Sequence, residues 1–231
     1  MIAARTTAIV TDIEGTTSSL AFVHDVLFPY AREALPEFVR RNRNDPTIAA
    51  ALQEVDGDTE VAIAMLIAWI DEDRKAAPLK LIQGRIWALG YADGTLKGHV
   101  YADAALALRS WHARGIALYV YSSGSIEAQK LIFAHSIAGD LTPCFRGYFD
   151  STIGAKVEAA SYARIGTEIG VAPAAILFLS DNPAELRAAR AAGVAVIGVQ
   201  RGGADAALNA FTVVRGFDEL ALAVPVQAPK G

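Results

Sequence analysis

The stretch Ala8–Thr17, which reads A-I-V-T-D-I-E-G-T-T, decides the fold of this chain. A short apolar run ends at Asp12, and Glu14 follows two residues later, just before Gly15. An apolar strand that ends in an acid places that acid at the carboxyl edge of a sheet, where open α/β folds bind their ligands. Gly15 allows the chain to turn sharply at once. The pattern therefore predicts a buried strand that presents Asp12 and Glu14 to a ligand.

Two interpretations of these acids are open from this stretch alone. In the first, Asp12 is a nucleophile, because aspartate can attack phosphoryl groups, and the second acid donates a proton or binds a metal. In the second, Asp12 is a solvated residue that ends a strand, and Thr16 caps a helix. The remainder of the chain favours the first interpretation.

Beyond about residue 100, short apolar runs alternate with helical patterns. Runs typical of strands buried on both faces occupy residues 116–122, 176–180, 194–199 and 212–214. Helical patterns occupy residues 103–114, 125–135, 155–169 and 183–192. Together with residues 8–12, this alternation predicts an α/β fold with a doubly wound parallel sheet of about five strands.

The segment between the first two strands breaks the alternation. Helical patterns occupy residues 22–41, 46–55, 59–75 and 78–88, with no good strand among them. We therefore expect an α/β core made of residues 1–17 and 101–231, with residues 18–100 inserted as a helical cap. A cap after the first strand can act as a lid over the site.

Composition narrows the class of protein. The 231 residues are 53% hydrophobic, which is enough for a sizeable core. The net charge of −4 gives no sign of a basic surface that would bind nucleic acid or an anionic membrane. The longest apolar run, residues 61–70, is too short to cross a bilayer core of ~30 Å. Cys144 is the single cysteine, which excludes an intramolecular disulfide and fits a reducing, cytoplasmic setting.

Three further features should reach the same sheet edge as Asp12. Ser122 and Ser123 end a strand before a helix, which suits phosphate binding, although a capping serine would look the same. Lys156 lies near the start of a predicted helix, where the helix dipole disfavours a cation. A residue that breaks such a preference can have a compensating role, so Lys156 either neutralises Asp12 and a bound phosphate or is a solvated lysine. Asp181 follows a strand and either caps a helix or joins Asp12 in binding Mg²⁺.

These motifs resemble those of the haloacid dehalogenase-like phosphohydrolases. Asp12-Ile-Glu14-Gly-Thr, Ser122-Ser123, Lys156 and Asp181 stand in the order and strand context of that superfamily's four motifs. A narrower set of strings resembles the enolase-phosphatases of methionine salvage over residues 8–200. These strings are D-I-E-G-T-T, F-V-H-D-V-L-F-P-Y-A, L-I-Q-G-R-I-W-A-L-G-Y, Y-S-S-G-S-I-E-A-Q-K-L-I-F and K-V-E-A-A-S-Y.

The resemblance implies an enzyme that enolises 2,3-diketo-5-methylthiopentyl-1-phosphate and then dephosphorylates it to 1,2-dihydroxy-3-keto-5-methylthiopentene. It implies one Mg²⁺ and a monomeric protein. Asp12 would be nucleophile and metal ligand, and Glu14 would contact the metal and act as acid and base. Ser122, Ser123 and Lys156 would bind the substrate, and Asp181 would bind the metal.

Two departures from the family pattern stand out: His24 replaces a lysine, and Q-R-G-G at residues 200–203 replaces an R-P-G-N-like turn. The first lies near the expected hinge of the cap, and we interpret the second as loop variation. Two other functions stay open: a related phosphatase for another small phosphate ester, and a catalytically silent binding module on the same fold.

Overall fold

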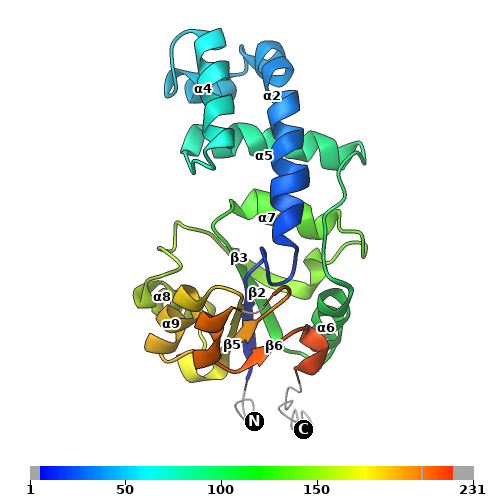
Figure 1. Cartoon of the computed structure of the whole chain (residues 1–231), viewed down its shortest axis with the longest axis vertical. Coiled ribbons are helices and arrows are strands. Elements are labelled where there is room, and N and C mark those ends of the chain that lie inside the picture. The colour runs from blue at the N-terminus through cyan, green and yellow to red at the C-terminus, as the bar shows by residue number, and fades with distance from the viewer. Residues whose placement is uncertain (1–5, 204, 221–231) are drawn as a thin grey trace. The chain divides into compact units, whose positions relative to one another are not determined.

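A parallel sheet of six strands forms the centre of the computed structural model, which describes residues 6–203 and 205–220 (Figure 1). Its order is β3-β2-β1-β4-β5-β6, and each neighbouring pair runs parallel. The strands are β1 (Ala8–Thr11), β2 (Ala117–Tyr121), β3 (Phe145–Phe149), β4 (Ile176–Ser180), β5 (Ala195–Val199) and β6 (Val213–Val214). The order reverses between β1 and β4, and such switch points are where open α/β sheets bind ligands.

The predicted α/β fold with a doubly wound parallel sheet is confirmed, with one strand more than expected. The additional strand, β3, lies at one edge of the sheet and reads F-R-G-Y-F. Arg146 is exposed and Gly147 lacks a side chain, so no continuous apolar run marks this strand in the sequence. Its pairing with β2 includes a shift of register between Leu118 and Tyr119.

Helices cover both sides of this sheet. They are α6 (Ala102–Ala113), α7 (Ile126–Ala134), α8 (Ala159–Ile169) and α9 (Pro183–Ala191). Figure 1 shows α8 and α9 on one side of the sheet and α6 on the other. Two strands at the centre, β1 and β4, are buried along their whole length, because helices shield them from water on both faces.

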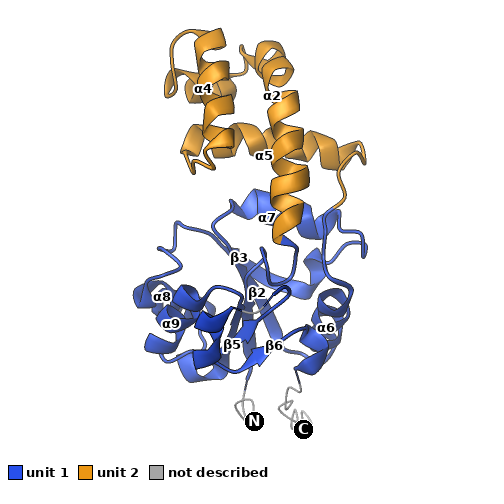
Figure 2. Ribbon diagram, viewed as in Figure 1, with its two compact units in different colours: residues 1–19, 98–231 blue, residues 20–97 orange. Residues whose placement is uncertain are grey.

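The chain divides into two compact units, coloured separately in Figure 2. Unit 1 contains residues 1–19 and 98–231, and unit 2 contains residues 20–97. Unit 2 is helical: α1 (Leu20–Phe22), a π-helical turn (Val23–Leu27), α2 (Phe28–Asn42), α3 (Pro46–Gln53), α4 (Thr59–Asp71) and α5 (Ala77–Ala92).

Unit 2 has a hydrophobic core of its own. Ala31, Leu35 and Val39 recur every four residues along α2, and all three are fully buried. Two aspartates cap the helices that follow, since the Asp45 side chain accepts N–H groups at the start of α3 and Asp58 does so for α4. Among the described residues, no helix combines the length and apolar character that crossing a membrane requires.

Candidate active site

Three strand ends meet at the switch point of the sheet. Thr11 in β1 pairs with Val120 in β2 and with Leu179 in β4. Asp12, Ser122 and Asp181 each follow within two residues of these paired positions. Parallel register therefore brings together side chains that stand far apart in the sequence.

Asp12 is almost fully buried and its carboxylate is held firmly. Its backbone N–H donates to the Leu179 carbonyl over 2.9 Å. Its Oδ1 accepts the Ile13 N–H at 2.8 Å and the Lys156 ammonium at 2.6 Å. Among the residues that the structure describes, both polar contacts of this carboxylate use Oδ1. These two contacts fix the orientation of the Asp12 carboxylate.

Lys156 is the cation of the site. Its side chain is only 12% exposed, and its ammonium also lies 2.8 Å from Glu185 Oε2. The segment is fixed by the Tyr162 hydroxyl, which donates to the Lys156 carbonyl over 2.7 Å. Burial disfavours the charged ammonium, but the carboxylates of Asp12 and Glu185 outweigh burial and raise the pKa of Lys156.

One step of the sequence argument for Lys156 was wrong. We expected a helix over residues 155–169 with Lys156 in its first turn, but α8 begins at Ala159. Lys156 lies in the preceding turn, so the helix dipole does not act on it as that argument assumed. Its two acidic partners, rather than a broken helix preference, explain its burial.

Glu185 completes a buried ionic cluster with Lys156 and Asp12. It lies in the first turn of α9, and its Oε2 also accepts the Ser180 hydroxyl at 2.9 Å. Burial and then the negative charge of Asp12 raise the pKa of Glu185, against the opposing effect of Lys156. The contact of Glu185 with Lys156 is visible only in the tertiary structure.

Asp181 rests on the turn that follows Asp12. Its backbone N–H donates to Thr16 Oγ1 over 3.0 Å, and Thr16 Oγ1 lies 3.5 Å from its Oδ1. A Cβ atom at Gly15 would overlap the Asp181 carboxylate, so a side chain there would displace that carboxylate. Burial and then the charge of Asp12 raise the pKa of Asp181 to about 6.

The sequence left open that Asp181 caps the helix that follows it. The cap is Asn182 instead, whose side chain accepts the Ala184 N–H.

This donor set fits a divalent cation. The carboxylates of Asp12 and Asp181 lie close enough for the charge of Asp12 to raise the pKa of Asp181. A hard cation bound to both would relieve the repulsion between them. The described residues contain no group of three His, Cys, Asp or Glu side chains placed to hold a metal. Mg²⁺ does not require such a group, because in phosphate-processing sites it binds one or two carboxylates together with substrate phosphates and water.

The loop after β2 carries Ser122 and Ser123, the two serines expected to bind phosphate. Ser122 is buried and its Oγ accepts the Gly124 N–H at 3.2 Å, while Ser123 is exposed. Ser125 caps α7 by accepting the Ala128 N–H. Gln129, which sequence reasoning missed, is buried and donates from Nε2 to the Gly124 carbonyl at 2.8 Å. The two serines therefore lie in a loop that Gln129 holds in place, next to a helix N-terminus.

Glu14 lies in the turn between β1 and α1 and is partly buried. Its backbone forms a bridge with Ser18. It stands two residues beyond Asp12 in the same turn, and its expected part in catalysis remains a prediction.

Comparison with known proteins places these features in context. Residues 6–193 match the model of the haloacid dehalogenase-like hydrolase family. The chain is 58% identical to a protein named Enolase-phosphatase E1 from Pseudomonas aeruginosa (strain UCBPP-PA14), covering 92% of this chain and 97% of that protein. A protein of the same name from Parvibaculum lavamentivorans is 57% identical, with 84% and 86% covered.

Solved structures share the fold of this chain. The UTR4 protein from Saccharomyces cerevisiae is similar with a TM-score of 0.81 and 34% identity, covering 93% of this chain and 99% of that one. A dehalogenase solved with an intermediate complex has a TM-score of 0.60 at 18% identity, which shows a shared fold alone.

Proposed function

The chain belongs to the haloacid dehalogenase-like hydrolases and, within them, to the enolase-phosphatases, and we propose that Asp12 is the residue that receives the substrate's phosphoryl group. The protein is an enzyme of L-methionine salvage. It converts 2,3-diketo-5-methylthiopentyl-1-phosphate to 1,2-dihydroxy-3-keto-5-methylthiopentene and phosphate. The observation that carries the proposed chemistry is the buried contact of 2.6 Å between the Lys156 ammonium and Asp12 Oδ1, at the switch point of the sheet.

The phosphoryl transfer follows from the orientation of Asp12. Oδ2 attacks phosphorus while Lys156 and the Ile13 N–H hold Oδ1, and the ester P–O bond breaks. The leaving oxygen takes a proton, for which Glu14 is the proposed donor. The same glutamate then activates water, which hydrolyses the aspartyl-phosphate and regenerates Asp12.

The substrate's phosphate is held by groups from two other parts of the sheet edge. Ser122 and Ser123 offer hydroxyl groups in the loop just before α7, and Lys156 offers a positive charge. Enolisation moves a proton from a carbon beside a carbonyl to the carbonyl oxygen. Glu14 is proposed for this transfer too, because its side chain reaches further from the backbone than an aspartate would.

Mg²⁺ is the proposed cofactor, one per chain, with Asp12, Asp181 and Glu14 as the residues that would hold it. When bound there, the ion would offset the repulsion between the substrate's phosphate and the carboxylate of Asp12. We expect chelation to abolish phosphate release and added Mg²⁺ to restore it.

Residues 18–100 are proposed to act as a cap that selects the substrate, while unit 1 performs phosphoryl transfer. Unit 2 supports this division because it has its own hydrophobic core and is inserted directly after the turn that carries Asp12. A monomeric state and a cytoplasmic location are also part of this proposal.

The decisive experiment offers the purified enzyme its diketo phosphate with Mg²⁺ and records the enediol chromophore and free phosphate together. The enolase-phosphatase reaction yields both, whereas a phosphatase for another small ester would act on its own substrate and leave the diketo phosphate unchanged. Asp12→Asn should release phosphate at less than a few per cent of the parent rate. Asp71→Asn is the matched control, because Asp71 forms an exposed ion pair with Arg32 on unit 2.

A further inference from the structure

Arg201 lies in the turn that the sequence suggested was mere loop variation, yet its side chain is only 9% exposed. Its Nε donates to the Thr16 carbonyl over 2.9 Å, and its Nη1 donates to Asp103 Oδ2 over 2.7 Å. The guanidinium also lies over the Tyr101 ring, 4.3 Å from the centroid. Its Nη1 also donates to the Arg215 carbonyl over 3.4 Å, and the guanidinium lies 5.2 Å from the centroid of the Phe217 ring. A surface loop does not need a buried arginine with three hydrogen bonds and two aromatic contacts.

Thr16 is the residue through which Arg201 can reach the active site. Its carbonyl is held by Arg201, and its hydroxyl accepts the Asp181 N–H at 3.0 Å. Thr16 is completely buried, so it has little freedom to adjust if either contact is lost. The Asp181 carboxylate lies against this turn, because it contacts the Thr16 hydroxyl and packs directly over Gly15.

Arg201 also joins this turn to the segment by which the chain returns to unit 1. Asp103, in the first turn of α6, accepts both Arg201 Nη1 and the Phe217 N–H, the latter at 2.7 Å. The Tyr101 N–H donates to the Thr17 carbonyl over 3.0 Å. These contacts fix the start of α6 to the turn that follows Asp12. The position of the Arg201 guanidinium is set by its hydrogen bond to Asp103 in that helix.

We propose that Arg201 is a positioning residue for the metal site, acting through Thr16 to hold the carboxylate of Asp181 in place. The inference rests on the proposed role of Asp181 as a metal ligand. The proposed role of Arg201 requires no contact of its own with the metal or the substrate. The guanidinium suits this task because it spans two acceptors in fixed directions, which an ammonium group cannot do.

The experiment measures Mg²⁺ binding to the whole protein by calorimetry, with no substrate present, alongside urea unfolding. Arg201→Met should weaken Mg²⁺ binding by about 10-fold to 100-fold, as loss of an outer partner of a metal ligand commonly does. Arg190→Met is the matched control, because Arg190 also lies over an aromatic ring, that of Phe211, and donates to a backbone carbonyl, that of Ala210. The control should leave Mg²⁺ binding unchanged.

A double substitution separates positioning from a general loss of stability. Thr16→Val removes the hydroxyl that contacts Asp181, so Arg201→Met should weaken Mg²⁺ binding by less than about two-fold in that background. An equal loss with and without the Thr16 hydroxyl would overturn the inference, as would unchanged Mg²⁺ binding in folded Arg201→Met. If that variant does not fold, Arg201→Lys replaces it, with the same expectation and the same overturning result.

Asp181→Ala keeps this test separate from the proposed function. Weaker Mg²⁺ binding in Asp181→Ala but not in the Arg201 variants refutes the positioning role alone. Unchanged Mg²⁺ binding in Asp181→Ala removes the proposed metal ligand, and with it the role inferred for Arg201.

Discussion

The ammonium of Lys156 lies 2.6 Å from Asp12 Oδ1, with both side chains close to nine-tenths buried. The charge of each compensates for the burial of the other, and Glu185 shares the same ammonium. Since Lys156 lies in a turn and Asp12 at the end of a strand, this contact ties two separate elements of unit 1 together. It therefore matters both for the fold of unit 1 and for the proposed chemistry.

Lys156→Met should lower the free energy of unfolding by about 3–5 kcal/mol, because it leaves the buried carboxylates of Asp12 and Glu185 without a counter-charge. Lys75→Met should change it by no more than about 1 kcal/mol, since Lys75 and Asp73 form an exposed pair. Urea unfolding of both variants in the presence of chelator measures the difference. Equal effects of the two substitutions would show that the buried cluster adds no stability.

Gly15→Ala should cost more stability than Gly94→Ala, although both glycines have positive φ angles, +72° and +81°. A side chain at either position carries a backbone cost of roughly 1–2 kcal/mol. A Cβ at Gly94 meets open space, whereas one at Gly15 overlaps the Asp181 carboxylate. The stability that Gly15→Ala loses beyond the loss of Gly94→Ala, measured by thermal or urea unfolding, thus reports the overlap with Asp181. Gly15→Ala should also weaken Mg²⁺ binding, whereas Gly94→Ala should not.

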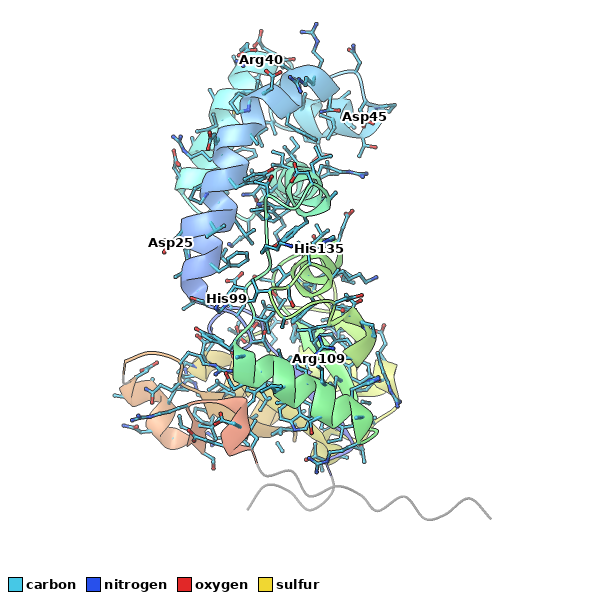
Figure 3. All side chains as sticks on the ribbon, turned by 90° about the vertical axis from the view of Figure 1, so that its right-hand side faces the viewer. Asp25, Arg40, Asp45, His99, Arg109 and His135 are labelled. Atoms are coloured by element: carbon cyan, nitrogen blue, oxygen red, sulfur yellow. The ribbon has the colours of Figure 1, made fainter. Side chains whose placement is uncertain are left out.

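His99→Gln should flatten the dependence of stability on pH between about pH 5 and pH 7.5. Nδ1 of His99, labelled in Figure 3, accepts the Ser19 N–H at 3.0 Å, which requires the neutral ring. Burial and then the charge of Arg201 lower the pKa of His99 below its ordinary value of 6.5. The unfolded chain therefore binds more protons in this range, so this histidine's contribution to stability falls as the pH falls.

The control for this measurement is His112→Gln, because His112 lies on the exposed face of α6. Urea unfolding at several pH values compares the two variants with the parent. If the parent and His99→Gln lose stability in parallel on acidification, His99 does not titrate with folding.

Glu14→Gln should fold normally and slow turnover by about 100-fold or more, which is the usual scale for loss of a general acid or base. Pre-steady-state traces should show slower enediol formation and slower phosphate release. Glu168→Gln, an exposed position on α8, should be indistinguishable from the parent. If only phosphate release slows, the proposed role of Glu14 in enolisation is wrong, and if neither step slows, Glu14 is not an acid or base.

His24→Lys restores the family pattern at an exposed residue of the π-helical turn in unit 2. If residues 18–100 choose the substrate, this change should alter kcat/KM for the diketo phosphate and leave that for a simple aryl phosphate unchanged. Parallel changes for both substrates would argue against a selective role for His24.

Local pattern was sufficient for much of this protein. The apolar runs before Asp12, Ser122 and Asp181 each predicted a buried strand that ends in a polar residue, and parallel strands necessarily bring such ends to one edge. The helical character of residues 18–100 was equally visible, because helix periodicity is encoded within a few neighbouring residues.

Tertiary structure alone decided the contacts that connect those elements. Arg201 meets a carbonyl 185 residues away in the sequence, and Lys156 finds Glu185 and Asp12 from a turn that looked like the start of a helix. The edge strand β3 is likewise a product of pairing with β2 rather than of its own apolar pattern. Propensity and periodicity describe a residue's neighbours along the chain, whereas a buried charge is stabilised by whichever partner the completed fold brings within reach.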